Sequence, residues 1–177
     1  MLAAASSVVM TARSSCPGID SRVWQRMNFR ETLAPRLASA TFGREMKQLF
    51  QHAAITDGIT VRVAVNFLPE QSRPQDGKWF WVYHIRIENG SADRVQLVSR
   101  HWRITDARGM VNIVDGEGVV GEKPILEPGE SHDYVSGCPL TTPHGTMEGF
   151  YTFHRSNRDP LEVRIPFFPL AAPAEAG

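Results

Sequence analysis

Hydrophobic and polar residues alternate with a period of two along most of the chain after residue 57. In residues 59–67, for example, Ile, Val, Val, Val and Phe occupy every second position. Successive side chains of a strand point to opposite faces of a sheet, so this pattern predicts strands with one buried face. The expected strands are 59–67, 79–88, 95–105, 111–114, a short one around Val119, 131–136, 147–154 and 161–167.

Short turn sequences separate these strands, and no helical pattern lies between them. Asp57–Gly58 and Asn89–Gly90 are typical turn pairs, and LEPGESHDY (126–134) resembles the corners of immunoglobulin-like modules. Without crossover helices, neighbouring strands must run antiparallel. We therefore predict an all-β fold, a fibronectin type III-like or immunoglobulin-like antiparallel β-sandwich of about seven strands. Pro166 indicates that the last strand lies at an edge or ends there.

Residues 1–50 have a different character, rich in Ala and Ser and without strand periodicity. We interpret them as an N-terminal extension that is partly helical or disordered. Thr41 is a suitable N-cap for a short helix over 41–54, because several apolar residues follow it at helical spacing. The β-sandwich domain is expected over 51–171, and 172–177 as a flexible tail.

Composition and charge exclude several classes of protein. The chain has 19 basic and 19 acidic residues, so it lacks the positive charge of a general nucleic-acid binder. No run of about 18 apolar residues predicts a membrane span. Cys16 and Cys138 are too few and too separate for a disulfide framework, and no basic residue precedes the apolar stretch at the N-terminus. A cytoplasmic location is expected.

Candidate catalytic and metal-binding residues are missing from the sequence pattern. None of the six histidines pairs with another at metal-ligand spacing, and no serine or cysteine lies in a nucleophile motif. The carboxylates are scattered along turns. We therefore predict no catalytic residue, no metal site and no cofactor.

One glycine motif suggests a ligand site. Gly116, Gly118 and Gly121 match the G-x-G-x-x-G pattern, with Lys123 beside them. Prolines at 124 and 128 prevent the helix that a dinucleotide fingerprint requires, so only a backbone nest for a phosphate or nucleotide is left. We favour the alternative that the glycines hold a tight turn between packed strands.

A second candidate is the pair Arg100 and Trp102, which share one face of the expected strand over 95–105. Tryptophan and arginine are common in interface hot spots, so the pair could form an interaction patch. The simpler interpretation, which we prefer, is a core tryptophan flanked by surface residues.

Four separated motifs resemble one known family. SRHWRITDARG (99–109), VDGEGVVGEKPILEPGESHDYVSG (114–137), TPHGTMEGFYTF (142–153) and IPFFPL (165–170) are similar, in order and spacing, to the ApaG family. The resemblance covers about residues 57–171. It implies a fibronectin type III-like sandwich and no established enzyme activity. It also implies links to divalent-cation homeostasis, namely cobalt resistance and magnesium efflux, and to genes for diadenosine tetraphosphate hydrolysis.

Three functions of different classes remain open from the sequence. We prefer a non-enzymatic module that binds an unknown protein partner, a role also inferred for related domains. The alternative is a small-molecule module that binds a nucleotide polyphosphate or metal–phosphate at residues 116–121. A hydrolase is the third option, for which we can name no catalytic residue.

Overall fold

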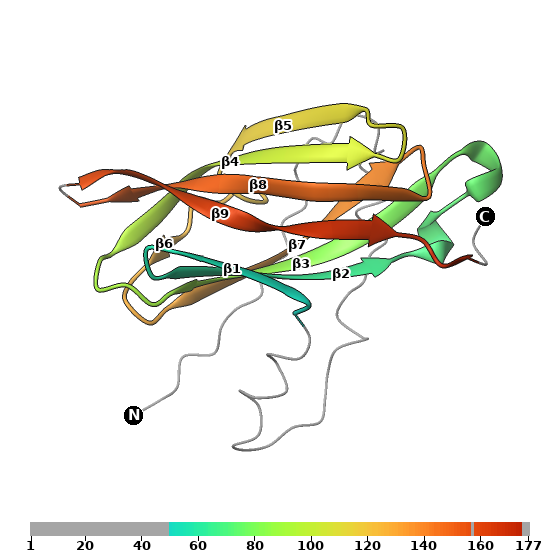
Figure 1. The fold of residues 1–177 in the computed structure, drawn as a ribbon. Coiled ribbons are helices and arrows are strands. Elements are labelled where there is room, and N and C mark those ends of the chain that lie inside the picture. The colour runs from blue at the N-terminus through green and yellow to red at the C-terminus, as the bar shows by residue number, and fades with distance from the viewer. Residues whose placement is uncertain (1–49, 157, 175–177) are drawn as a thin grey trace, which may run out of the picture.

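The computed structural model describes residues 50–156 and 158–174. In this part the chain forms two antiparallel sheets that pack face to face (Figure 1). The first sheet has the order β1-β2-β3-β7. Its strands are His52–Thr56 (β1), Ile59–Phe67 (β2), Trp79–Asn89 (β3) and Ser131–Leu140 (β7).

The second sheet has the order β5-β4-β8-β9, and a short strand, β6, also pairs with β4. Two three-residue 3₁₀ helices, η1 and η2, lie in the polar connection between β2 and β3. The remaining elements are Pro69–Gln71 (η1), Pro74–Asp76 (η2), Val95–Asp106 (β4), Val111–Glu117 (β5), Ile125–Leu126 (β6), His144–Arg155 (β8) and Arg158–Ala171 (β9).

The core lies between the two sheets and consists of the apolar residues that alternate along each strand. Trp81 of β3 and Tyr151 of β8 are almost fully buried, and Phe168 of β9 packs edge-on against Trp102 of β4 with ring centroids 6.0 Å apart. One polar side chain, Asn89, is buried at the end of β3. It makes four hydrogen bonds to its surroundings, so it is a satisfied polar residue.

The predicted fold class is confirmed: within the described residues the protein is an antiparallel β-sandwich with almost no helix. It has nine strands instead of about seven. One difference is β6. No separate strand forms around Val119, which makes only an isolated bridge to Glu122.

The other difference corrects the helix expected over 41–54. Residues 41–49 lie outside the described residues, but His52–Thr56 form strand β1. This strand pairs with β2 through the two-residue turn Asp57–Gly58. The apolar spacing that indicated a helix is short, and pairing with β2 outweighs the weak local preference.

The two sides of the sandwich differ. On one side β9 lies against β1 and β2, and Thr56 Oγ1 accepts a hydrogen bond from the Arg164 amide at 3.1 Å. On the other side, β5 and β7 each end their sheet and leave the inter-sheet space accessible. We call this the open side. Pro166 lies in β9, which ends its sheet as expected.

Candidate functional site

Gly116 of the glycine motif lies near the end of β5, and the rest of the motif forms the connection between β5 and β6. The Val119 amide donates a hydrogen bond to the Glu122 carbonyl at 2.8 Å, and the Glu122 amide donates one to the Val119 carbonyl at 2.9 Å. Val120 and Gly121 are the two turn residues, with φ angles of 51° and 83°. Positive φ at both positions is the geometry of the tight turns preferred in β-hairpins. The motif therefore forms a tight reverse turn.

Gly118 is required for a second reason. Its φ is 55°, and a Cβ added there would lie 2.0 Å from the Glu122 carbonyl oxygen. Its amide donates a hydrogen bond to the Val98 carbonyl at 2.8 Å, which ties the loop to β4. Gly118 and Gly121 both have a positive φ, which agrees with the interpretation of the glycines as residues of a tight turn.

The loop covers part of the open side. Val119 is 1% exposed and belongs to the core, while Val120 packs against the same cluster. A β-branched residue at positive φ is strained. The contact of Val120 with the core offsets that strain, and the turn keeps both valines over the gap between the sheets.

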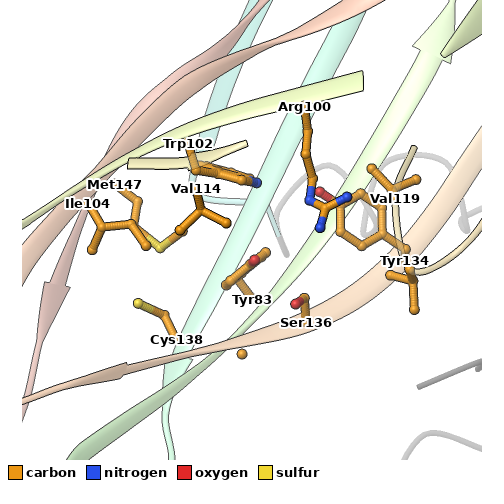
Figure 2. Close-up of a pocket in the computed structure, with 12 residues that line it drawn as sticks. Tyr83, Arg100, Trp102, Ile104, Val114, Val119, Tyr134, Ser136, Cys138 and Met147 are labelled. Carbon is orange, nitrogen blue, oxygen red and sulfur yellow. The ribbon is translucent and has the colours of Figure 1, made fainter. Parts of the chain in front are cut away.

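Arg100 holds this loop from the inner side of the sandwich. It lies on the inner face of β4 and extends toward Tyr134 and Val119 (Figure 2). Its Nη1 donates hydrogen bonds to the carbonyls of Glu117 at 2.8 Å and Gly118 at 2.7 Å. A Cβ at Gly116 would lie 2.8 Å from the guanidinium carbon, so that glycine leaves room for the charge. Two features that look separate in the sequence thus form one structural unit.

Trp102 is not available to a partner. It is 3% exposed and packs against Tyr83, with ring centroids 5.6 Å apart. Arg100 and Trp102 do share one face of β4, but that face points into the sandwich. The interpretation of Trp102 as a core residue holds, and the surface patch of Arg100 and Trp102 does not form.

Two buried tyrosines lie beside Arg100. The hydroxyl groups of Tyr134 and Tyr151 form a hydrogen bond across the sheets. Burial raises the pKa of both phenols well above 10.0, while the positive charge of Arg100 acts in the opposite direction. The cavity next to them measures about 20 Å³, room for about one water molecule. These groups stabilise the core and are too enclosed to reach a substrate.

Several polar groups of the glycine loop already have partners. The amides of Gly118, Val119 and Glu122 donate to backbone carbonyls. Lys123 Nζ lies 2.9 Å from Glu117 Oε2, so its charge is balanced by a neighbouring carboxylate. A phosphate at residues 116–121 would have to replace the contact between Lys123 and Glu117. Within residues 50–156 and 158–174, no three His, Cys, Asp or Glu side chains are grouped for a metal ion.

A groove opens on the other half of the open side, where the glycine loop does not reach. Its volume is about 380 Å³, and its walls come from the end of β4, from β5 and from the end of β7. Two apolar residues at its rim are exposed, Met110 by 68% and Val111 by 45%. Ile113, exposed by 46%, lies beside Val111 on the outer face of β5. The lining residues are Ile104, Asp106, Met110, Val111, Asn112, Val114, Cys138, Pro139, Leu140 and Thr141.

We did not predict this groove from the sequence, although the sequence contains one signal for it. The segment MVNIV (110–114) is apolar on both faces of the strand, whereas an outer face is usually polar. In the structure, Val114 faces the groove, and Val111 and Ile113 face solvent. Within the part of the chain that the structure describes, no helix is long and apolar enough to cross a membrane.

Comparison with known proteins gives consistent results. The family profile described as the ApaG domain matches residues 69–155. Protein ApaG of Methylobacterium sp. (strain 4-46) is 49% identical over 122 residues, covering 69% of this chain and 94% of that protein. Protein ApaG of Rhodospirillum centenum is 47% identical with the same coverage. The crystal structure of the ApaA protein from Bordetella pertussis, 46% identical, superposes with a TM-score of 0.63, over 66% of this chain and 94% of that one.

Proposed function

Because the chain belongs to the ApaG family, we propose that it acts as a non-enzymatic ApaG-type binding module that recognises a protein partner on its open side. The observation that carries this proposal is the groove of about 380 Å³ with Met110 and Val111 exposed at its rim and Ile113 exposed beside Val111 on the outer face of β5. Contiguous exposed apolar residues are costly in water, and they commonly mark binding surfaces. The family resemblance connects such binding to cobalt and magnesium homeostasis.

The remaining chemistry of the described residues favours binding over catalysis. The two buried tyrosines and Arg100 are occupied with one another and with backbone carbonyls. Cys138 is buried at the back of the groove, and it is the thiol among the described residues. An apolar groove with few polar groups can bind apolar side chains but offers no activated nucleophile or acid–base pair.

A peptide-display selection on the full chain tests the proposal. A library of random peptides should yield sequences that bind the parent protein and lose binding to the double variant Val111→Glu/Ile113→Glu. Ile55→Glu is the matched control, because Ile55 is an apolar residue, 73% exposed, on the first strand of the other sheet. Circular dichroism must show that all variants fold. No enrichment, or enrichment that the double variant does not affect, would contradict the proposal.

The nucleotide alternative has a separate test. If the glycine loop bound a nucleotide polyphosphate or metal–phosphate, millimolar diadenosine tetraphosphate would raise the melting temperature of the parent and raise it less in Lys123→Ala. We expect no change in either protein, because Lys123 is paired with Glu117 and the amides of Gly118, Val119 and Glu122 are hydrogen-bonded. A rise that depends on Lys123 would place the nucleotide function first.

A further inference from the structure

We propose that the free edge of β5 binds an extended segment of the partner as an added antiparallel strand, and that this segment is basic at its N-terminal end and apolar at its C-terminal end. This inference rests on the proposed function and specifies the chemistry of the partner. Its basis is the orientation of the β5 backbone, the residues that β5 presents along its edge and the groove beside it.

The backbone of β5 has hydrogen-bonding groups directed away from its sheet. Two hydrogen bonds at the ends of the β4–β5 ladder show which positions are hydrogen-bonded. At one end the Asp106 amide donates to the Met110 carbonyl, and at the other end the Gly118 amide donates to the Val98 carbonyl. In an antiparallel pair, hydrogen-bonded and non-hydrogen-bonded positions alternate. With the register of Thr105 opposite Val111, the even-numbered residues of β5 bond to β4. The odd-numbered residues Val111, Ile113, Asp115 and Glu117 therefore direct their amides outward. The carbonyls of Val111, Ile113 and Asp115 also point outward, whereas that of Glu117 accepts the hydrogen bond from Arg100 Nη1.

Among the residues that the structure describes, this edge lacks the protection found on the opposite edge of the same sheet. Proline lacks an amide donor, and β9 contains three prolines, at 160, 166 and 169, and also lies against β1. In contrast, β5 contains no proline, and β5 ends its sheet on the open side. A seven-residue strand with outward-directed amides and with exposed Val111 and Ile113 is a template for another strand.

The side chains along the edge specify the charge of the segment. Val111 and Ile113 are apolar, whereas Asp115 and Glu117 have side chains that are 70% and 83% exposed. Each carboxylate has one basic neighbour, His101 and Lys123 respectively, and retains exposed oxygen for another. Opposite charges on directly paired residues stabilise antiparallel strands. The N-terminal end of an antiparallel segment lies opposite Glu117 and Asp115, and its residues there should be basic. Its C-terminal end lies opposite Ile113 and Val111, and its residues there should be apolar.

The groove specifies the residue type at the positions of the added strand that lie between those just described. Residues of the added strand opposite Asn112 and Val114 would direct their side chains to the inner face, where Ile104, Val114 and Leu140 line the groove. Those two positions should be apolar. The complete pattern is basic, any residue, basic and then four apolar residues.

A second copy of the chain fits this edge less well. Two β5 strands that pair symmetrically about Val114 would bring Ile113 opposite Asp115 and Val111 opposite Glu117. Apolar residues would then face carboxylates at four positions. A symmetric pairing about Asn112 joins the apolar halves but leaves Asp115 and Glu117 beyond the strand of the second copy. The basic–apolar segment matches both halves of β5.

The test uses the full chain and the peptide Lys-Ser-Lys-Val-Ile-Leu-Val. Amide hydrogen exchange, measured by NMR with and without the peptide, should slow at Val111, Ile113, Asp115 and Glu117. The amides of Asn112 and Val114 should change little, because β4 already protects them. A peptide with Glu in place of both lysines should bind about tenfold more weakly. A peptide with N-methyl groups on alternate residues should lose protection at the β5 edge.

Each outcome separates this inference from the proposed function. Binding without slowed exchange at the outward amides, or no binding of the peptide, overturns strand addition. The proposed function then stands if displayed peptides still depend on Val111 and Ile113, and falls with the inference if they do not. Equal binding of the Glu peptide overturns the charge assignment. The same amides could also exchange more slowly at high protein concentration without peptide, while sedimentation shows a dimer. That result would assign the edge to a second copy of the chain and overturn the inference.

Discussion

Replacing Gly118 and Gly121 separately by alanine should cost very different amounts of folding free energy. The two glycines lie in the same loop and both have positive φ, 55° and 83°. They differ in their surroundings. A Cβ at Gly121 meets nothing within 4 Å, whereas a Cβ at Gly118 would lie 2.0 Å from the Glu122 carbonyl oxygen. The pair therefore separates the cost of backbone conformation from the cost of steric overlap.

The expected cost for Gly121→Ala follows from its φ alone. An L-residue in the left-handed region is less stable than glycine by about 1–2 kcal/mol. Alanine also lowers the conformational entropy of the unfolded chain, which stabilises the folded state by roughly 0.4–1 kcal/mol. The free energy of unfolding should therefore fall by about 1 kcal/mol.

Gly118→Ala adds a second term. Carbon and oxygen cannot approach to 2.0 Å, so the Glu122 carbonyl must move away. That carbonyl accepts the hydrogen bond from Val119 that closes the turn, and a typical hydrogen bond contributes about 1 kcal/mol. Movement of the turn also disturbs Val119, which is 1% exposed in the core. We expect a total of about 3 kcal/mol or more, at least ~2 kcal/mol above Gly121→Ala.

Urea unfolding of both variants, followed by tryptophan fluorescence, measures the difference. Similar m-values would show that the unfolded states are comparable. A Gly118→Ala variant that fails to fold while Gly121→Ala folds agrees with the predicted order. Equal costs, or a larger cost for Gly121→Ala, would refute the reasoning and show that the loop does not hold the described turn.

Three further variants test other parts of the core. Asn89→Ala should lower the free energy of unfolding by roughly 2–3 kcal/mol in urea unfolding, because it leaves buried carbonyls without donors; a loss below about 0.5 kcal/mol would contradict this. Arg100→Met should cost about 2–3 kcal/mol and shift the NMR amide signals of residues 115–123, since two hydrogen bonds to loop carbonyls are lost; unchanged loop signals would disprove the anchoring role. Because burial raises the pKa of Tyr134 and Tyr151 above 10.0, both stay protonated in the folded state while the unfolded chain ionises. Their stabilising contribution is complete below about pH 10, and stability then falls with rising pH by about 1.4 kcal/mol per unit for each tyrosine. Tyr151→Phe should reduce this slope in unfolding experiments between pH 9 and 11, and an unchanged slope would contradict the pKa directions.

The sequence by itself determined the positions of most strands. The period of two in residues 59–67 and 79–88 matches β2 and β3 closely, because the alternation reports directly which face of a strand is buried. The four ApaG-like motifs identified the family, since they lie where turns and buried faces constrain the residue types. The glycine motif was also interpreted correctly as a turn, because the prolines that follow it exclude a helix.

Local pattern failed where pairing with distant residues decides the outcome. Residues 52–56 show no clear alternation of large apolar and polar residues, and their hydrogen bonding to β2 makes them a strand. Arg100 and Trp102 share a face as expected, but the sequence could not show whether that face pointed inward. The answer depends on β5 and the glycine loop, whose Gly116 lies opposite Arg100 in the register.

Only the tertiary structure showed which edges of the sandwich are covered. The strands β5 and β9 end the same sheet, yet β9 lies against β1 and β2 while β5 borders an open groove. Alternation describes one strand at a time, whereas an edge is defined by the strand that is missing beside it. Whether Val111 and Ile113 are exposed therefore depends on how segments far apart in the chain are arranged around them, and that arrangement is set by packing of the whole core.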